Sequence, residues 1–188
     1  MACTVTLLVY VLLQFIAFLC VLVGTPLDMF HLSSGGSRFG NTPCITLWGL
    51  NEQCYTSRNN ISLEELWIAC PDRRDRFRRA QVFAIISICV YGLAALLGFI
   101  ALCCCSCLRW VCLALNIAGV ATLCVVWASM VRTYEKADGS CIMQKLVSFL
   151  GVGFMLLVIA WCLDIINILL LLLSCPARYP SKGLDSNE

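Results

Sequence analysis

The composition of this 188-residue chain is that of a membrane protein, because 61% of its residues are hydrophobic, 13% are charged and the mean hydropathy is +0.88. A soluble domain is about 45–50% apolar and about 25% charged, so a soluble core of this size could not bury the excess. The net charge of +2 is too small to indicate binding to DNA or RNA. These values leave little chain for a separate soluble enzyme domain, and the lipid bilayer is the first expected partner.

Four apolar stretches divide the chain, at residues 5–23, 80–102, 111–131 and 147–173. Each reaches or approaches the roughly 20 apolar residues with which a helix crosses about 30 Å of hydrocarbon. Lipid offers the backbone no hydrogen-bond partners outside its own helix. The sequence therefore predicts an all-α membrane protein, a bundle of four antiparallel transmembrane helices with both termini on one side. The last stretch would be about 40 Å long at ~1.5 Å per residue, and should tilt or protrude.

The segments between these stretches complete a single domain over residues 1–188: a connector (24–79), a short link (103–110), a second loop (132–146) and a tail (174–188). Within the connector, Cys44 to Trp48 has the β-branched and aromatic composition of a short strand. Ser62-Leu63-Glu64-Glu65 has the form of a capping box, in which the Ser62 hydroxyl and the Glu65 carboxylate satisfy opposing end amides, and predicts a short helix through Trp67. We expect the connector to fold as a small, partly β domain.

Four cysteines lie on the connector side of the membrane, with Cys44, Cys54 and Cys70 in the connector and Cys141 in the second loop. An even set in a folded context is typical of a disulfide framework in an oxidising compartment. A Cys44–Cys54 pair would close a hairpin and leave Cys70 with Cys141, but four cysteines allow three pairings and the sequence does not choose among them. Four free thiols are the alternative. A zinc site is disfavoured because the spacings form no C-x-x-C knuckle.

Two signals disagree about the side that the connector faces. Lys and Arg are more numerous in the connector and second loop than in the link and tail, which favours a cytosolic connector. The disulfide candidates, and the sequon at Asn60 that is glycosylated only on the lumenal side, favour the outside. Four thiols at the opposite membrane boundary are candidates for palmitoylation from the cytosol, namely Cys103, Cys104, Cys105 and Cys107. We therefore predict an extracellular connector and second loop, with a cytosolic link, tail and N-terminus.

One carboxylate, Asp164, lies inside the fourth apolar stretch, where a charge is costly. Asn167 falls three residues later on the same helical face, and Asn116 in the third stretch and Gln14 in the first are available partners. Such residues face the interior of a bundle and mark either an interhelical hydrogen-bond network or a path for ions or protons. We favour the network, because the sequence has neither the paired charges nor the broken helices that transport would need.

Catalytic motifs are missing from the sequence, which has no phosphate loop, HExxH motif or Ser-His-Asp arrangement. Its single histidine, His31, has no histidine partner for a metal ion. A pairing of His31 with a connector thiol is the one conceivable catalytic arrangement, and we do not favour it. The sequence therefore predicts a protein that is not an enzyme and uses no cofactor or metal.

The strip from Cys44 to Gly49, Cys-Ile-Thr-Leu-Trp-Gly, followed by Cys54, resembles the signature of the amastins, surface glycoproteins of trypanosomatid parasites. The resemblance extends to residues 23–30, 76–81, 104–127 and 160–164. Two positions depart from the family pattern: Asn51 replaces the usual basic residue or Gln, and Gln53 replaces the usual acidic residue, Asn or Thr. Both cysteines are kept, so the departures would affect only a partner that recognises charge along this strip.

The resemblance implies four spans, an exposed first loop, residence in the plasma membrane, and a part in contact with the host cell and in survival there. More distantly, the chain is similar to claudin-like tetraspan proteins, whose first outer loop folds as a sheet around a Trp and a disulfide.

We therefore predict a noncatalytic surface protein whose outer loop contacts a host membrane, a host surface protein or a like neighbour. The loop's signature residues are Cys44, Leu47, Trp48, Gly49 and Cys54. An ion, proton or small-solute transporter or channel centred on Asp164 is the alternative. Trp48 either reaches the partner or fills the core of its own small domain, and the sequence leaves both open.

Overall fold

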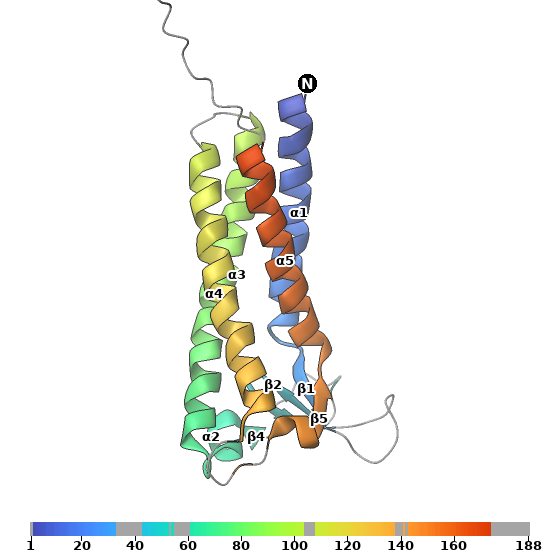
Figure 1. Cartoon of the computed structure of the whole chain (residues 1–188), viewed down its shortest axis with the longest axis vertical. Helices are drawn as coiled ribbons and strands as arrows, with labels where there is room; N and C mark the ends of the chain where they lie inside the picture. Colours follow the sequence, from blue (N-terminus) through green and yellow to red (C-terminus); the bar gives the residue numbers. More distant parts are fainter. Residues whose placement is uncertain are drawn as a thin grey trace, which may run out of the picture.

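The computed structural model describes residues 2–32, 43–52, 54, 61–103, 108–137, 141 and 143–173, and its main feature is a bundle of long helices (Figure 1). The four helices are α1 (Ala2–Gly24), α3 (Pro71–Cys103), α4 (Leu108–Glu135) and α5 (Val152–Leu173). All four are long and apolar enough to cross a membrane. The predicted fold class, a four-helix membrane protein with a small disulfide-bonded sheet, is confirmed.

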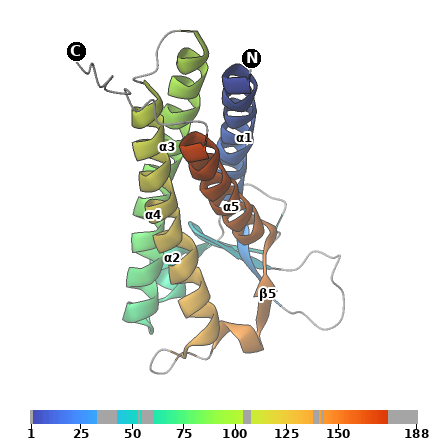
Figure 2. The ribbon, with the colours of Figure 1, turned by 45° about the horizontal axis from the view of Figure 1, so that its top comes forward.

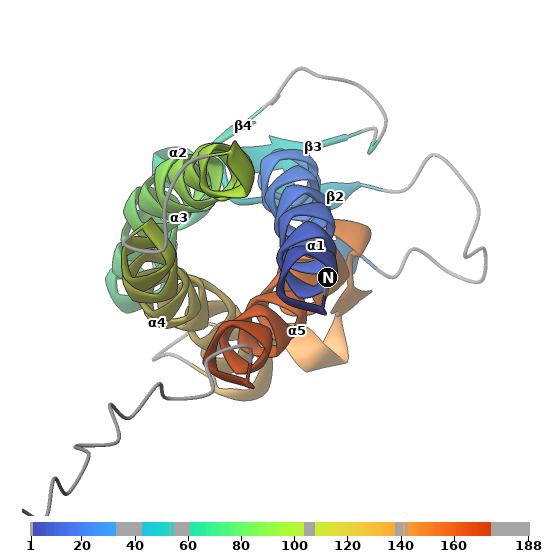
Figure 3. The same cartoon turned by 90° about the horizontal axis from the view of Figure 1, so that it is seen from above.

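The helices stand in a ring in the order α1, α3, α4, α5 (Figure 3). The start of α1 and the end of α5 lie at the same end of the bundle (Figure 1). Large apolar side chains such as Leu12, Ile85 and Leu169 point outward and are about half exposed, whereas small residues such as Ala17 and Ala160 are fully buried. This distribution suits lipid tails on the outside and close helix packing on the inside.

A five-stranded antiparallel sheet closes the opposite end of the bundle (Figures 1 and 2). Its strands are β1 (Asp28–Leu32), β2 (Cys44–Thr46), β3 (Gly49–Asn51), β4 (Ile61–Ser62) and β5 (Ser148–Leu150), in the spatial order β4-β3-β2-β1-β5. The short helices α2 (Leu63–Leu66) and η1 (Gln144–Leu146) lie beside it. We call the sheet with these two helices the cap. Because β5 lies between the second loop and α5 and pairs with β1, the segments before α3 and after α4 build one domain.

The fourth helix starts later than the sequence predicts, at Val152 instead of residue 147, because residues 148–150 form β5. The next residue, Gly151, donates its N–H to the carbonyl of Met29 over 2.9 Å. A Cβ at Gly151 would overlap the backbone and carboxylate of Asp28, so only glycine lets the chain cross β1 this closely. The apolar residues 148–150, which the sequence assigns to the fourth helix, therefore pair as a strand instead. At 22 residues, or about 33 Å, α5 fits the bilayer without the expected excess.

Helix α3 starts earlier than the predicted span, at Pro71 instead of residue 80. Proline suits the first position of a helix because its missing N–H would have no helical partner there. The first turns of α3 therefore belong to the cap and carry five of the chain's ten arginines, whereas the later turns lie in the bundle.

An aromatic cluster forms the core of the cap. Phe30 of β1 stacks on Tyr134 of α4 with ring centroids 6.1 Å apart, and it meets Phe77 of α3 edge-on at 6.4 Å. Trp67, which follows α2, lies 5.8 Å from Phe77. Rings from four segments thus hold the sheet against the start of α3 and the end of α4.

Arg73 is the largest fully buried side chain of the described residues. Its guanidinium lies 4.8 Å from the centre of the Trp67 ring, and its Nη1 donates to Oε1 of Gln144 in η1 over 3.1 Å. A buried cation needs such partners to offset its lost hydration. Arg73 therefore ties α3 to the second loop.

The predicted capping box is made in part. The Ser62 hydroxyl accepts the N–H of Glu65 over 3.4 Å, as predicted. The Glu65 carboxylate, however, accepts the hydroxyl proton of Ser62 over 3.2 Å, where the sequence led us to expect a backbone amide as its donor. The helix that follows is a single turn, Leu63–Leu66.

Candidate functional site

The signature strip forms the hairpin between β2 and β3, and Thr46 holds its turn. The Thr46 hydroxyl donates to the Gly49 carbonyl over 3.0 Å and accepts the N–H groups of Trp48 and Gly49 over 3.1 and 3.2 Å. The Leu47 side chain is fully buried, and its carbonyl accepts Nε2 of Gln81 of α3 over 2.8 Å. Trp48, next in the chain, is exposed. The turn thus anchors one apolar residue in the core and presents the next to the surroundings.

The tryptophan that fills the cap is Trp67, which is 8% exposed, whereas Trp48 is 36% exposed. The sequence left the place of Trp48 open and gave Trp67 no role. The available signal was the position of Trp67 directly after the capped turn that begins at Ser62, where a large ring can fold back on the adjacent helix.

A polar pocket of about 390 Å³ lies beside the hairpin, between α2 and α3. It is lined by Leu63, Glu64, Arg74, Arg78 and Gln81. Arg74 and Arg78 are one helical turn apart, so their side chains emerge on the same face of α3. Gln81 also holds the Leu47 carbonyl, which places the pocket next to the hairpin that carries Trp48. The sequence showed the arginine cluster without showing that a pocket is built from it.

The four cysteines of the connector and second loop form two disulfides, Cys44–Cys54 and Cys70–Cys141. Their Cα atoms lie 5.4 and 6.3 Å apart, within the range that a disulfide spans. The first closes a short loop around the β2–β3 hairpin. The second joins residues 71 positions apart and fixes the start of α3 to the second loop. Of the three pairings that the sequence left open, this is the one that the structure contains.

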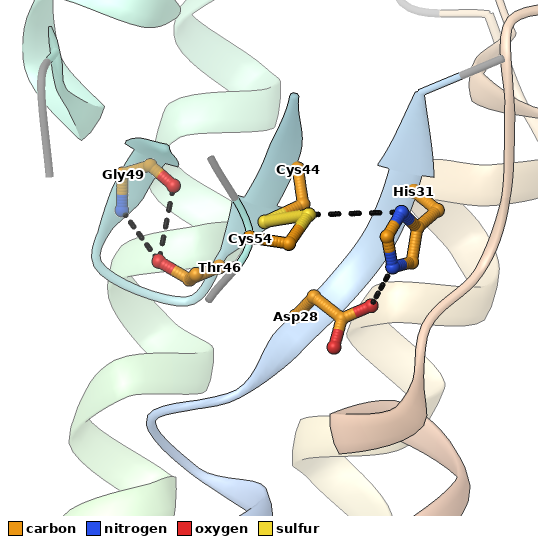
Figure 4. The surroundings of a disulfide bond; sticks show 6 residues. All are labelled: Asp28, His31, Cys44, Thr46, Gly49 and Cys54. Atoms are coloured by element: carbon orange, nitrogen blue, oxygen red, sulfur yellow. Dashed lines mark hydrogen bonds and ion pairs between the residues drawn. A yellow bond between two sulfur atoms is a disulfide. The ribbon is translucent and has the colours of Figure 1, made fainter. Parts of the chain in front are cut away.

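His31 lies beside the Cys44–Cys54 disulfide (Figure 4). Its Nδ1 is 3.6 Å from Sγ of Cys54, and its Nε2 is 3.1 Å from Oδ2 of Asp28. The pairing of His31 with a connector cysteine is thus present in space, with the cysteine in a disulfide. The sequence did not predict that Asp28 would pair with His31, because strict strand alternation puts residues three apart on opposite faces of a sheet. An irregularity between Asp28 and Phe30 in the β1–β2 register brings them together.

The predicted intramembrane polar residues, Gln14, Asn116, Asp164 and Asn167, all lie buried inside the ring of helices. Asn167 donates to Oε1 of Gln14 over 2.8 Å and so links α5 to α1. Asn116 donates to the Tyr10 hydroxyl over 3.4 Å and so links α4 to α1. We call these residues, together with Tyr10 and Tyr91, the polar layer. The two tyrosines were missed because a tyrosine in an apolar stretch reads equally well as a residue at the membrane interface.

Asp164 of α5 faces the Tyr91 hydroxyl of α3, and Gly119 of α4 lies next to both side chains. A Cβ at Gly119 would lie 2.7 Å from Oδ2 of Asp164 and 2.9 Å from Cε2 of Tyr91. The Asp164 oxygens, Oδ1 of Asn116 and Oδ1 of Asn167 make no hydrogen bond of ordinary geometry within the part of the chain that the structure describes. Nε2 of Gln14 and the Tyr91 hydroxyl also make no such bond, so the layer contains unpaired donors as well as unpaired acceptors.

Some predicted modification sites lie outside the described residues: Asn60, Cys104, Cys105 and Cys107. Cys103 is the last residue of α3.

A ring of four apolar helices that carries a small disulfide-bonded sheet at one end defines a multi-pass membrane protein with a folded cap. The family model for the amastin surface glycoprotein matches residues 15–171, which is most of the chain. The chain therefore belongs to the amastin surface glycoprotein family, as the resemblance of its signature strip predicted. No curated protein matches it.

Proposed function

We propose that this chain is a noncatalytic plasma-membrane protein whose cap faces away from the cell and contacts a host membrane, and that this contact supports survival inside the host. The observation that carries the proposal is the exposed Trp48 beside a pocket with two arginines. Membership of a surface glycoprotein family supports the location.

The chemistry of this surface matches a lipid headgroup region. Tryptophan is enriched at membrane interfaces because its ring has both an apolar body and a polar N–H. Guanidinium groups pair with phosphate through parallel hydrogen bonds. Ile68, between α2 and α3, is 77% exposed and adds apolar area near the pocket. A host surface protein and a second copy of this chain are the competing partners.

The outward orientation is supported by the two disulfides, because such bonds persist in oxidising compartments. The arginine count opposes it. A membrane-impermeant thiol reagent, added to intact cells before and after reduction, should label Cys44, Cys54, Cys70 and Cys141 only after reduction. Labelling only after the cells are permeabilised would reverse the orientation and remove the proposed contact.

The contact is tested by the binding of anionic phospholipid vesicles to the protein in nanodiscs. We expect Trp48→Ala and the double variant Arg74→Gln/Arg78→Gln each to weaken binding at least fivefold while the protein stays folded. Arg79→Gln is the matched control, because Arg79 is exposed on the same helix and does not line the pocket. Leu47→Ala should instead destabilise the cap by about 2–5 kcal/mol, since Leu47 is buried.

Two outcomes would redirect the proposal. Unchanged vesicle binding in both pocket and Trp48 variants would remove the membrane contact. Binding to host cells that disappears when the host surface is treated with protease would make a host protein the partner.

A second candidate function, transport of protons, ions or small solutes through Asp164, is favoured by the gathering of polar side chains from all four helices in the polar layer. Flux through proteoliposomes should then fall in Asp164→Asn. Equal flux in the two forms, or none in either, would remove this function.

A further inference from the structure

The two disulfides of the cap have different surroundings. The Cys44–Cys54 bond lies against the imidazole of His31, whose other ring nitrogen is held by the Asp28 carboxylate (Figure 4). His31 is also the residue directly opposite Cys44 in the β1–β2 register. Since His31 is the single histidine of the sequence, the Cys70–Cys141 bond has no such neighbour.

The two sulfurs of the first bond also differ in access. Cys44 is fully buried, whereas Cys54 is partly exposed. The His31 side chain is 28% exposed, and the Asp28 side chain beneath it is 9% exposed. A small molecule can therefore approach Cys54 and His31 from one side, while Cys44 and Asp28 stay covered. Exchange rates depend on access to the attacked sulfur, which here is that of Cys54. Cys70 and Cys141 are likewise buried and partly exposed, so the feature that distinguishes the first bond is the imidazole beside it.

We propose that the Cys44–Cys54 disulfide is a thiol-exchange site for a low-molecular-weight thiol, with Cys54 as the exchanging sulfur and the His31–Asp28 pair as the proton carrier. A thiolate attacks Sγ of Cys54 and forms a mixed disulfide there. The bond to Cys44 breaks, and its electron pair goes to Sγ of Cys44, which takes a proton from the imidazolium of His31, the residue opposite Cys44 on β1.

A second thiolate completes the reduction by attacking the outer sulfur of the mixed disulfide. Cys54 then leaves as a thiolate beside His31, and two molecules of external thiol have become one external disulfide. The two electrons reside in the thiol of Cys44 and the thiolate of Cys54. In the reverse direction Cys54 is the nucleophile, because a neighbouring imidazolium favours its thiolate.

Among the described residues, the titratable groups on the elements packed around His31 are the following. Asp28 on the same strand is its ion-pair partner. Of the residues on the flanking strands, Cys44 is the only ionisable one on β2, and β5 contributes Ser148, Phe149 and Leu150, none of which titrates. Within α5, which packs near β1, the ionisable side chains are Cys162 and Asp164, several turns inside the bundle. Asp28 thus sets the orientation of the imidazole.

The exchange has a structural consequence. The hairpin with Leu47 and Trp48 lies within the loop that this disulfide closes. Reduction removes the closure and loosens the hairpin, while the Cys70–Cys141 bond still holds α3 to the second loop.

The test uses the full chain, oxidised and in nanodiscs, with reduced glutathione as the thiol. Differential alkylation and mass spectrometry follow each cysteine with time. We expect Cys44–Cys54 to open at least tenfold faster than Cys70–Cys141, and the glutathione adduct to form on Cys54. His31→Gln, which keeps a hydrogen-bonding side chain but cannot carry the proton, should slow opening of the first bond about tenfold and leave the second unchanged.

A pH series separates proton transfer from simple access. In the parent protein the rate per glutathione thiolate should fall as pH rises, because His31 loses its proton; in His31→Gln it should be flat. Circular dichroism shows whether the variant is folded, and Asp28→Asn gives a second test by weakening the same pH dependence. Equal pH profiles in the parent and His31→Gln, or an adduct on Cys44, would overturn the proposal.

Discussion

The cap and the bundle are held together in different ways. The cap has a stacked aromatic core, a buried arginine and two disulfides. Inside the bundle, the helices meet through small residues and through a few side-chain hydrogen bonds such as Asn167 to Gln14. The difference follows from the solvent. Water drives apolar side chains together in the cap, whereas lipid tails are as apolar as the helices, so close packing and polar pairs must select the helix partners.

The largest expected effect is loss of the cross-link between the two loops. Replacing Cys70 and Cys141 by Ser releases a closure over 71 residues and should cost about 4 kcal/mol of unfolding free energy in the chain-entropy account. The same change at Cys44 and Cys54, which are 10 residues apart, should cost about 3 kcal/mol. SDS titration followed by circular dichroism measures both. An equal or reversed order would show that the long closure does not dominate the stability of the cap.

The next effect concerns the buried arginine. Arg73→Ala removes the cation from the Trp67 ring and leaves the Gln144 amide without its donor, so we expect a loss of about 3 kcal/mol. Arg78→Ala, on the exposed side of the same helix, is the control and should change stability by less than about 0.5 kcal/mol. The comparison is made on purified protein by the same SDS titration. Similar losses in both variants would mean that the cap does not depend on the buried contact.

Between the bundle helices, Gly119 of α4 is a glycine that we expect to be sensitive to substitution. A methyl group there would meet the Asp164 carboxylate and the Tyr91 ring at less than 3 Å, and both are held in the packed interior. Gly119→Ala should therefore cost about 2 kcal/mol through overpacking. At Gly92 the nearest atom is the end of the Phe18 ring at 3.2 Å, which can move aside, so Gly92→Ala should cost less. If the two variants unfold at the same SDS fraction, the space between α4 and α5 at Gly119 can accommodate an extra methyl group.

The bundle was more predictable than the cap. Hydropathy alone locates the spans because lipid imposes one solution on an apolar stretch of sufficient length. It fails at Ser148 to Leu150, where pairing with β1 overrides an apolar run that continues into α5. The disulfide set could be proposed from spacing, but the choice of pairing depends on where β1 and the second loop meet in space.

The candidate sites divide in the same way. The signature strip predicted a feature at Trp48, but not that Trp67 would fill the core and leave Trp48 at the surface. The partnership of Asp28 with His31 depends on an irregularity in the strand register, which the sequence pattern does not encode. The amides and the carboxylate of the polar layer were anticipated because each is costly in lipid on its own. Its two tyrosines were missed, and the detailed pairs depend on how the helices are rotated.

The smallest expected effect is that of the amide pair between α1 and α5. A double-mutant cycle with Asn167→Ala and Gln14→Ala should give a coupling of about 1 kcal/mol, since hydrogen bonds between membrane helices average about 0.6 kcal/mol and reach about 1.7 kcal/mol. The pair of Asn116 and Tyr10, at 3.4 Å, should couple more weakly and is the internal control. A coupling near zero for Asn167 and Gln14 would mean that packing alone selects the helix partners. The polar layer would then not stabilise the bundle. The free-energy cost of burying its polar side chains in the membrane would have to be explained by a function such as transport.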